Sequence, residues 1–194
     1  MMNKRLKQGS TFLLAVALTF PLLTLPGAKA ANAIDTDAEC SIQFDIGGNS
    51  SELLSASIPV NLYKVASVDV SGNYTATGTF AKLDLSSVSA DNLDTAAATW
   101  SERAAEAKKL LKDDTEPTTT VTLTQGRGTA TRLKTGLYLV DTPKVITPNY
   151  TYTFTPYLVS LPTNNYYNGK DASDNWIYNL TGSNAVGLKT EQHV

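Results

Sequence analysis

The spacing of apolar and polar residues divides the chain into stretches of two kinds. Period-two alternation, with many β-branched and aromatic residues, predicts β-strands on both sides of a central segment. The expected strands span residues 40–46, 57–68, 75–80, 118–124, 130–133, 136–140, 150–160 and 176–180, the last resuming at 186–188. Short segments rich in turn-forming residues separate most of these strands, which favours antiparallel pairing.

The central segment, residues 91–111, is rich in alanine, leucine, glutamate and lysine and has helical periodicity. Its expected apolar face carries Trp100, Ala104, Ala107 and Leu111, and its expected solvated face carries Ser101, Glu102, Lys108 and Lys109. Such a pattern is typical of an amphipathic helix. Pro117 follows, and proline cannot continue a helix. The fold class predicted is therefore all-β with one inserted helix, an antiparallel β-sandwich.

The first 30 residues have the pattern of a signal peptide. Basic Lys4, Arg5 and Lys7 precede an apolar run at 12–25, and the small residues of Ala28-Lys29-Ala30 follow. The apolar run is shorter than the ~20 residues of a membrane span. We therefore expect cleavage after Ala30, a secreted or extracellular protein, and no membrane span after cleavage.

The remainder is expected to form one domain. The predicted organisation is a flexible leader at 31–39, a sandwich domain at 40–190 and a terminal tail at 191–194. Removing residues 1–30 takes away four basic residues and no acidic one from a chain with 16 basic and 18 acidic residues. The resulting acidic balance argues against a nucleic-acid partner, because such partners are bound by clustered lysine and arginine.

Few residues offer catalytic or metal chemistry. His193 is the single histidine and lies next to the end of the sequence, so a serine–histidine triad or a histidine metal site lacks parts. Cys40 is the single cysteine, which excludes an internal disulfide. It is interpreted as a small buried residue, with an intermolecular disulfide as the alternative. We expect a protein that is not an enzyme and has no cofactor or metal.

Five segments, in order, resemble the N-terminal domain of Gram-positive pilin backbone proteins and related LPxTG-type (CNA-B-like) surface proteins. They are VNLYKVA at 60–66, the helix around Trp100, GLYLV at 136–140, YTFTPYLVSLP at 152–162 and WIYNL at 176–180. The resemblance implies an immunoglobulin-like sandwich and a structural or adhesive role in surface fibres or in attachment to a host or cell. It also implies partners that are other pilin or surface-protein subunits, joined by a sortase.

The resemblance further implies two kinds of covalent site. Related domains form an isopeptide bond between a lysine and an asparagine or aspartate, assisted by a buried acid, and the candidates are Lys64, Asn179 and Asp141. The alternative is that Lys64 lies at a strand edge, Asn179 faces water and Asp141 opens a turn. Lys189 is the candidate sortase acceptor, with a solvated terminal lysine as its alternative.

The family's C-terminal sorting signal is expected to be absent. The nearest match to LPxTG, LPTNN at 161–165, lies inside the predicted domain. The sequence is thus expected to be a truncated member or a stand-alone secreted one.

A function of another class also fits the composition. Exposed aromatic side chains in loops can stack on sugar rings, and Tyr150, Tyr166 and Tyr167 lie in predicted loops. The alternative function is an exported carbohydrate-binding module.

Overall fold

The structure is a computed structural model that describes residues 33–47, 51–90, 97–164 and 176–194. These all belong to the second of two units of the chain, Ala31–Val194. The strands are β1 (Glu39–Asp45), β2 (Ile58–Val68), β3 (Tyr74–Ala76), β4 (Thr119–Leu123), β5 (Arg127–Lys134), β6 (Gly136–Asp141), β7 (Val145–Ile146), β8 (Thr151–Phe154), β9 (Tyr157–Leu161), β10 (Asn179–Leu180) and β11 (Thr190–His193). The helices are α1 (Ser51–Ser55) and α2 (Ala97–Leu110), and short 3-10 turns lie at Gly78–Phe80 and Gly182–Asn184.

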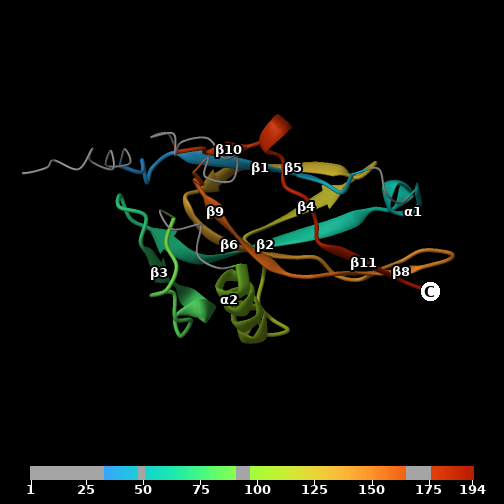
Figure 1. Cartoon of the computed structure of the whole chain (residues 1–194), viewed down its shortest axis with the longest axis horizontal. Helices are drawn as coiled ribbons and strands as arrows, with labels where there is room; N and C mark the ends of the chain where they lie inside the picture. The colour runs from blue at the N-terminus through green and yellow to red at the C-terminus, as the bar shows by residue number, and fades with distance from the viewer. Residues whose placement is uncertain (1–32, 48–50, 91–96, 165–175) are drawn as a thin grey trace, which may run out of the picture. The chain divides into compact units, whose positions relative to one another are not determined.

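The strands form three sheets (Figure 1). One has the order β10-β1-β5, and a second has the order β3-β2-β6-β9 with β4 also paired to β2. A small third sheet has the order β11-β8-β7. Pairing between these strands is antiparallel except for β1 with β10. The predicted fold class, an all-β, immunoglobulin-like antiparallel sandwich with an inserted helix, is confirmed, and the inserted helix is α2. The short helix α1 was not predicted.

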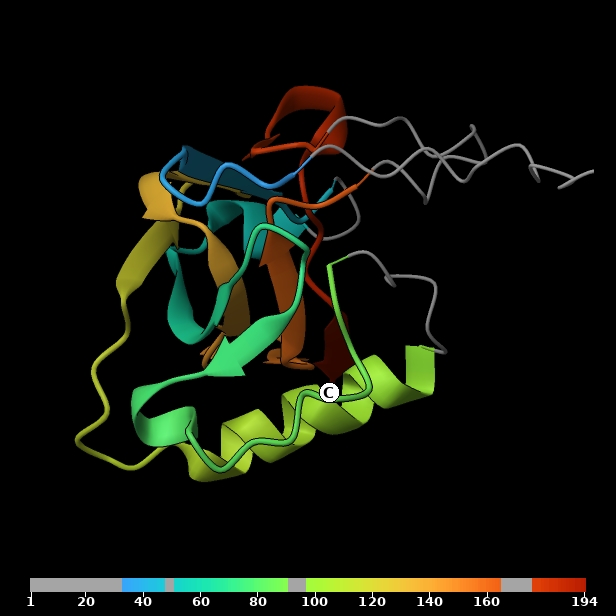
Figure 2. The same cartoon turned by 90° about the vertical axis from the view of Figure 1, so that its left-hand side faces the viewer.

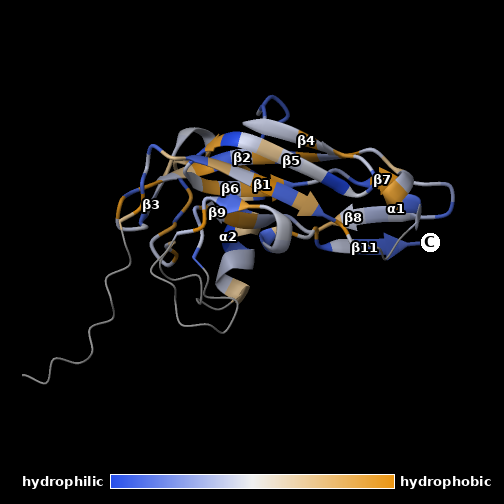
Figure 3. Ribbon diagram, turned by 90° about the horizontal axis from the view of Figure 1, so that it is seen from above, coloured by the Kyte–Doolittle hydropathy of each residue, from blue (hydrophilic) through white to orange (hydrophobic). Residues whose placement is uncertain are grey.

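The second sheet is apolar on both faces because it separates two cores. On β2, Val60 and Leu62 pack into the core between the sheets, whereas Tyr63 and Val65 pack toward α2. Each residue of β6 is buried. Figure 2 shows the layers, with α2 lying along one side of the second sheet and β1 and β10 on the other side. Figure 3 shows apolar residues gathered along β1, β2, β6 and β9.

The helix packs through the face that the sequence predicts. Ala104 and Ala107 are fully buried, and Trp100 and Leu111 are partly buried against the same core. The ring of Trp100 meets that of Tyr74 edge-on, with centroids 6.4 Å apart and planes at 82°. This geometry is favourable for an aromatic pair and fixes the start of the helix against β3.

The long strand expected at 150–160 is two strands in different sheets. β8 pairs with β7 and β11, whereas β9 pairs with β6. The break falls at Thr155-Pro156, where proline offers no N–H to a ladder. The chain therefore leaves one sheet and enters the next at this proline.

Two predicted boundary segments are also different in the structure. Ile34, in the expected flexible leader, is 2 % exposed, and its N–H donates to the Val70 carbonyl at 2.9 Å. The Thr135 hydroxyl donates to the Thr36 carbonyl at 2.8 Å. The leader prediction is thus wrong for residues 33–39, because one large apolar residue is enough to anchor them. The expected tail at 191–194 is wrong as well, since Glu191, Gln192 and His193 lie in β11.

Candidate functional site

Lys64 projects into the sandwich interior. It shares a face of β2 with Val60 and Leu62, and burial lowers the pKa of its ammonium, which the nearby Cys40 partly offsets. Burial raises the pKa of the Cys40 thiol to about 11, with a smaller opposing effect of Lys64. Burial also raises the pKa of Tyr138 to about 12. These three side chains form a titratable cluster in which Cys40 and Tyr138 are buried and Lys64 is partly buried. Cys40 is a small core residue, as expected.

Asp141 lies on the opposite face of the same sheet. Its carboxylate accepts a hydrogen bond from Nζ of Lys108 on α2 and forms an ion pair with it. The side chain of Asp141 is 11 % exposed and that of Lys108 is 47 % exposed. The prediction that Lys108 only faces solvent is wrong, because its flexible stem reaches back to the end of β6.

Asn179 lies on the outer face of the first sheet. Its Oδ1 accepts a hydrogen bond of 2.7 Å from the Ser41 hydroxyl, and the residue is exposed. Ser41 alternates along β1 with Cys40 and Ile42, which point inward. Asn179 therefore points away from the interior that Lys64 enters.

The structure does not bring Lys64, Asp141 and Asn179 together. Lys64 is in the sandwich interior, Asp141 is on the helix side, and Asn179 is on the outer surface. An isopeptide bond requires the amine, the carboxamide and the assisting acid within contact distance. The structure thus gives no support for this bond at these residues, and the physical reason is the strict alternation of side chains across a sheet.

We expect Lys108→Met to lower the free energy of unfolding by about 1–2 kcal/mol, because it leaves the mostly buried Asp141 carboxylate without its charged donor. Urea denaturation measures this change. Lys109→Met is the matched control, because Lys109 is the exposed neighbour on α2 and should change stability by less than about 0.5 kcal/mol. Equal losses for the two variants would contradict a structural role for the Lys108–Asp141 pair.

Lys189 lies directly before β11 and is held by its backbone. Its carbonyl accepts a hydrogen bond of 2.9 Å from the Thr155 N–H. Its Nζ lies 5.7 Å from the centroid of the Tyr157 ring, within the range of a cation–π contact. The Tyr157 hydroxyl in turn donates to the Gly187 carbonyl at 2.8 Å, and burial raises the pKa of Tyr157. The lysine is exposed yet has a defined position.

A groove of ≈ 210 Å³ runs beside Lys189. The first turns of α2 form one wall of the groove, and β9 forms the other. Four consecutive residues of β9 line it. The lining residues are Ala97, Trp100, Ser101, Tyr157, Leu158, Val159, Ser160, Thr163 and Lys189. Because side chains alternate across a strand, four consecutive lining residues indicate that the groove follows the edge of β9. Within the described residues this edge has no strand partner.

Trp100 lines this groove, and its indole N–H is buried without an acceptor among the described residues. Sequence reasoning did not find the groove, because it arises where a helix and a strand edge that are distant in sequence meet. The one sequence signal was the tryptophan at the start of an alanine-rich helix.

The tyrosines proposed for sugar stacking fall in different places. Tyr166 and Tyr167 lie outside the described residues. Tyr150 is partly buried, and its ring meets that of Tyr152 at 6.1 Å and 63°. Its carbonyl accepts hydrogen bonds from the N–H and the hydroxyl of Thr147. Tyr150 is therefore part of the turn between β7 and β8, where its backbone bonds to Thr147 and its ring packs against Tyr152.

In the part of the chain that the structure describes, no helix is long and apolar enough to cross a membrane.

The comparisons with known proteins give similarities of fold. No protein-family model matches the chain, and no curated protein matches it. The fold is similar to the fimbrial protein FimP from Actinomyces oris, with 20% identity, a TM-score of 0.46, and coverage of 82% of this chain and 31% of FimP. It is also similar to the major pilin SpaD from Corynebacterium diphtheriae, with 21% identity, a TM-score of 0.41, and coverage of 81% and 31%. The major pilin SpaA of the same organism gives 19% identity, a TM-score of 0.36, and coverage of 78% and 30%. The chain spans about a third of the length of each of these proteins.

Proposed function

We propose that this protein is an exported structural subunit of the pilin type, which contributes to extracellular fibres or to attachment, and that Lys189 is its point of covalent linkage to another subunit. The observation that carries the proposal is the position of Lys189, an exposed amine held by Tyr157 at the end of a strand-edge groove. The sequence resemblance to pilin backbone domains supports the same role.

The chemistry assigned to Lys189 is acyl transfer from a transpeptidase of the sortase class. The amine first loses a proton, and its nitrogen then attacks the acyl carbon of the thioester that joins the enzyme to a donor subunit. The carbon–sulfur bond breaks, the enzyme thiolate leaves, and an amide forms between the donor and Lys189. The groove leaves space for the extended residues that precede the acyl carbon, since a strand edge offers backbone groups to such a peptide.

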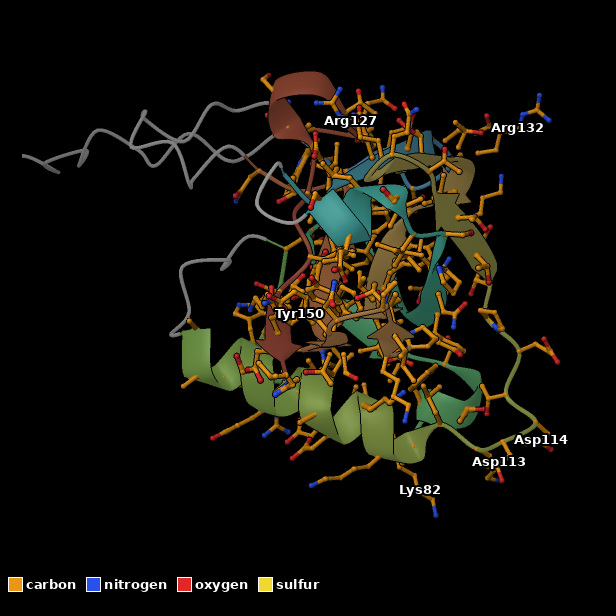
Figure 4. The ribbon with its side chains drawn as sticks, turned by 90° about the vertical axis from the view of Figure 1, so that its right-hand side faces the viewer. Lys82, Asp113, Asp114, Arg127, Arg132 and Tyr150 are labelled. Carbon is orange, nitrogen blue, oxygen red and sulfur yellow. The ribbon has the colours of Figure 1, made fainter. Side chains whose placement is uncertain are left out.

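The test is incubation of the protein with a sortase and a peptide that carries an LPxTG signal, followed by mass mapping of the adduct. We expect the adduct on Lys189 and its loss in Lys189→Arg, because the guanidinium of arginine stays protonated. Lys82→Arg is the matched control, because Lys82 is an exposed lysine that points into solvent far from the groove (Figure 4). Adducts that persist in Lys189→Arg on other lysines would overturn the assignment.

A further inference from the structure

β11 has one paired edge and one outward edge. Its register with β8 places Glu191 opposite Thr153 and His193 opposite Thr151. The Thr155 N–H donates a hydrogen bond to the Lys189 carbonyl, so Lys189 and Thr155 form the next pair of the same register. This bond shows that Lys189 and Thr155 are a hydrogen-bonded pair of the ladder. Because bonded and non-bonded pairs alternate, the backbone groups of Glu191 and His193 point toward β8. Those of Thr190 and Gln192 point away from it.

The outward edge is polar and accessible. All four residues of β11 are exposed, and Figure 3 shows the strand as hydrophilic at the margin of its sheet. Within the described residues the sheet ends at this strand. An exposed strand edge is a template for pairing with another chain.

We propose that β11 pairs antiparallel with β11 of a second copy of this chain, with Gln192 facing the partner's Gln192 across a two-fold axis. This register uses the backbone groups of Gln192, which point outward, and leaves the ladder to β8 intact. It joins the two small sheets into one continuous sheet. A two-fold arrangement is also the commonest symmetry for association of identical chains.

Charge complementarity selects this register. Glu191 and His193 have side chains that are 68% and 51% exposed and lie on the same face of the sheet. Oε2 of Glu191 is 4.0 Å from Nε2 of His193, and the imidazole carries a positive charge only when it is protonated. With Gln192 on the axis, Glu191 stands opposite the partner's His193 on both sides of the axis. These are non-hydrogen-bonded positions, where facing side chains are closest and opposite charges stabilise a sheet.

Neighbouring registers fit less well. A shift that places Glu191 on the axis brings two carboxylates together and requires backbone groups that already bond to β8. A shift that places Thr190 on the axis pairs Glu191 with the partner's Lys189, but Lys189 lies over the Tyr157 ring. That shift would also use residue 188, which precedes the strand.

Cysteine trapping tests the proposal in the full chain. Gln192→Cys places two thiols directly opposite each other, within the Cα separation that a disulfide spans, whereas two Thr190→Cys side chains are separated by about four residues of strand. We expect Gln192→Cys to form disulfide dimers at least ten times faster than Thr190→Cys. Cys40 is 1 % exposed and stays out of the reaction. Equal rates would indicate random collision and overturn the proposal, and faster trapping of Thr190→Cys would overturn the register.

A charge exchange provides a second measurement on the same background. In a buffer acidic enough to protonate the His193 imidazole, Glu191→Lys or His193→Glu, each added to Gln192→Cys, should slow disulfide formation between identical variant chains, because like charges then face each other. A mixture of the two variants should form mixed disulfide dimers at the original fast rate, because the introduced lysine at position 191 then faces the introduced glutamate at position 193. Asp114→Lys changes the net charge by the same amount as Glu191→Lys, but at an exposed loop far from β11, and should have no effect (Figure 4). Failure of the mixture to regain trapping would exclude the Glu191–His193 pairing.

Discussion

Gly136→Ala is expected to be the most damaging small substitution in this protein, lowering the free energy of unfolding by about 3 kcal/mol or more. Gly136 begins β6 with a φ of +149°, a conformation that side-chain-bearing residues rarely adopt. A Cβ at this position would lie 2.4 Å from the Ala66 carbonyl oxygen and 2.8 Å from Cε of Lys64. The lysine stem can move, but the carbonyl belongs to β2, which pairs with β6 along its length.

Urea denaturation of Gly136→Ala beside Gly182→Ala separates the steric effect from the backbone preference. Gly182 also has a positive φ, +60°, but no atom lies within 4 Å of its added Cβ. Its substitution is therefore expected to cost only about 1–2 kcal/mol. If both variants lost the same amount, the close approach of β2 to Gly136 would not determine the stability of this sheet.

Trp100→Ala is expected to lower the free energy of unfolding by about 3 kcal/mol, at the low end for such truncations because the ring is only partly buried. The ring packs on the core between α2 and the second sheet and meets Tyr74 edge-on. Its removal leaves a space beneath the first turns of α2 and takes away one wall of the groove beside Lys189. Thermal or urea unfolding measures the loss.

Trp100→Phe is the informative partner variant. It keeps most of the aromatic packing and removes an indole N–H that is buried without an acceptor among the described residues, so its cost should be about 1 kcal/mol or less. Ser101→Ala, on the exposed side of the same turn, should be nearly neutral. A loss below about 1 kcal/mol for Trp100→Ala would contradict the anchoring of α2 by this residue.

The strands and the helix could be predicted because the pattern that indicates each of them lies within a short stretch of neighbouring residues. Residues 136–140 form a continuous apolar run, and β6 is buried on both faces between a sheet and a helix. The helical spacing of Ala104 and Ala107 identified the buried face of α2. Lys64 shares a strand face with Val60 and Leu62, but β2 is buried on both faces, so alternation alone does not say which face lies in the sandwich interior.

The structure places the three candidate isopeptide residues apart, and the same alternation of side chains explains why. Asp141 is three residues after Tyr138 and one after Val140, so its side chain lies on the opposite face of β6 from theirs. It therefore faces α2 and Lys108. Asn179 pairs beside Ser41, an outward position of β1. Strand pairing decides which faces meet, and no local pattern records that pairing.

The sequence by itself was enough to predict an export signal, the acidic balance, the all-β class with an inserted helix, and the buried face of that helix. The tertiary structure alone decided that Pro156 divides one predicted strand between two sheets, that Ile34 anchors the leader, and that Lys108 reaches Asp141. It also decided that Lys189 stands beside a groove formed by α2 and β9, and that β11 presents an open edge. The physical reason is that periodicity depends on neighbouring residues, whereas sheet order and groove formation depend on contacts between residues far apart in the chain.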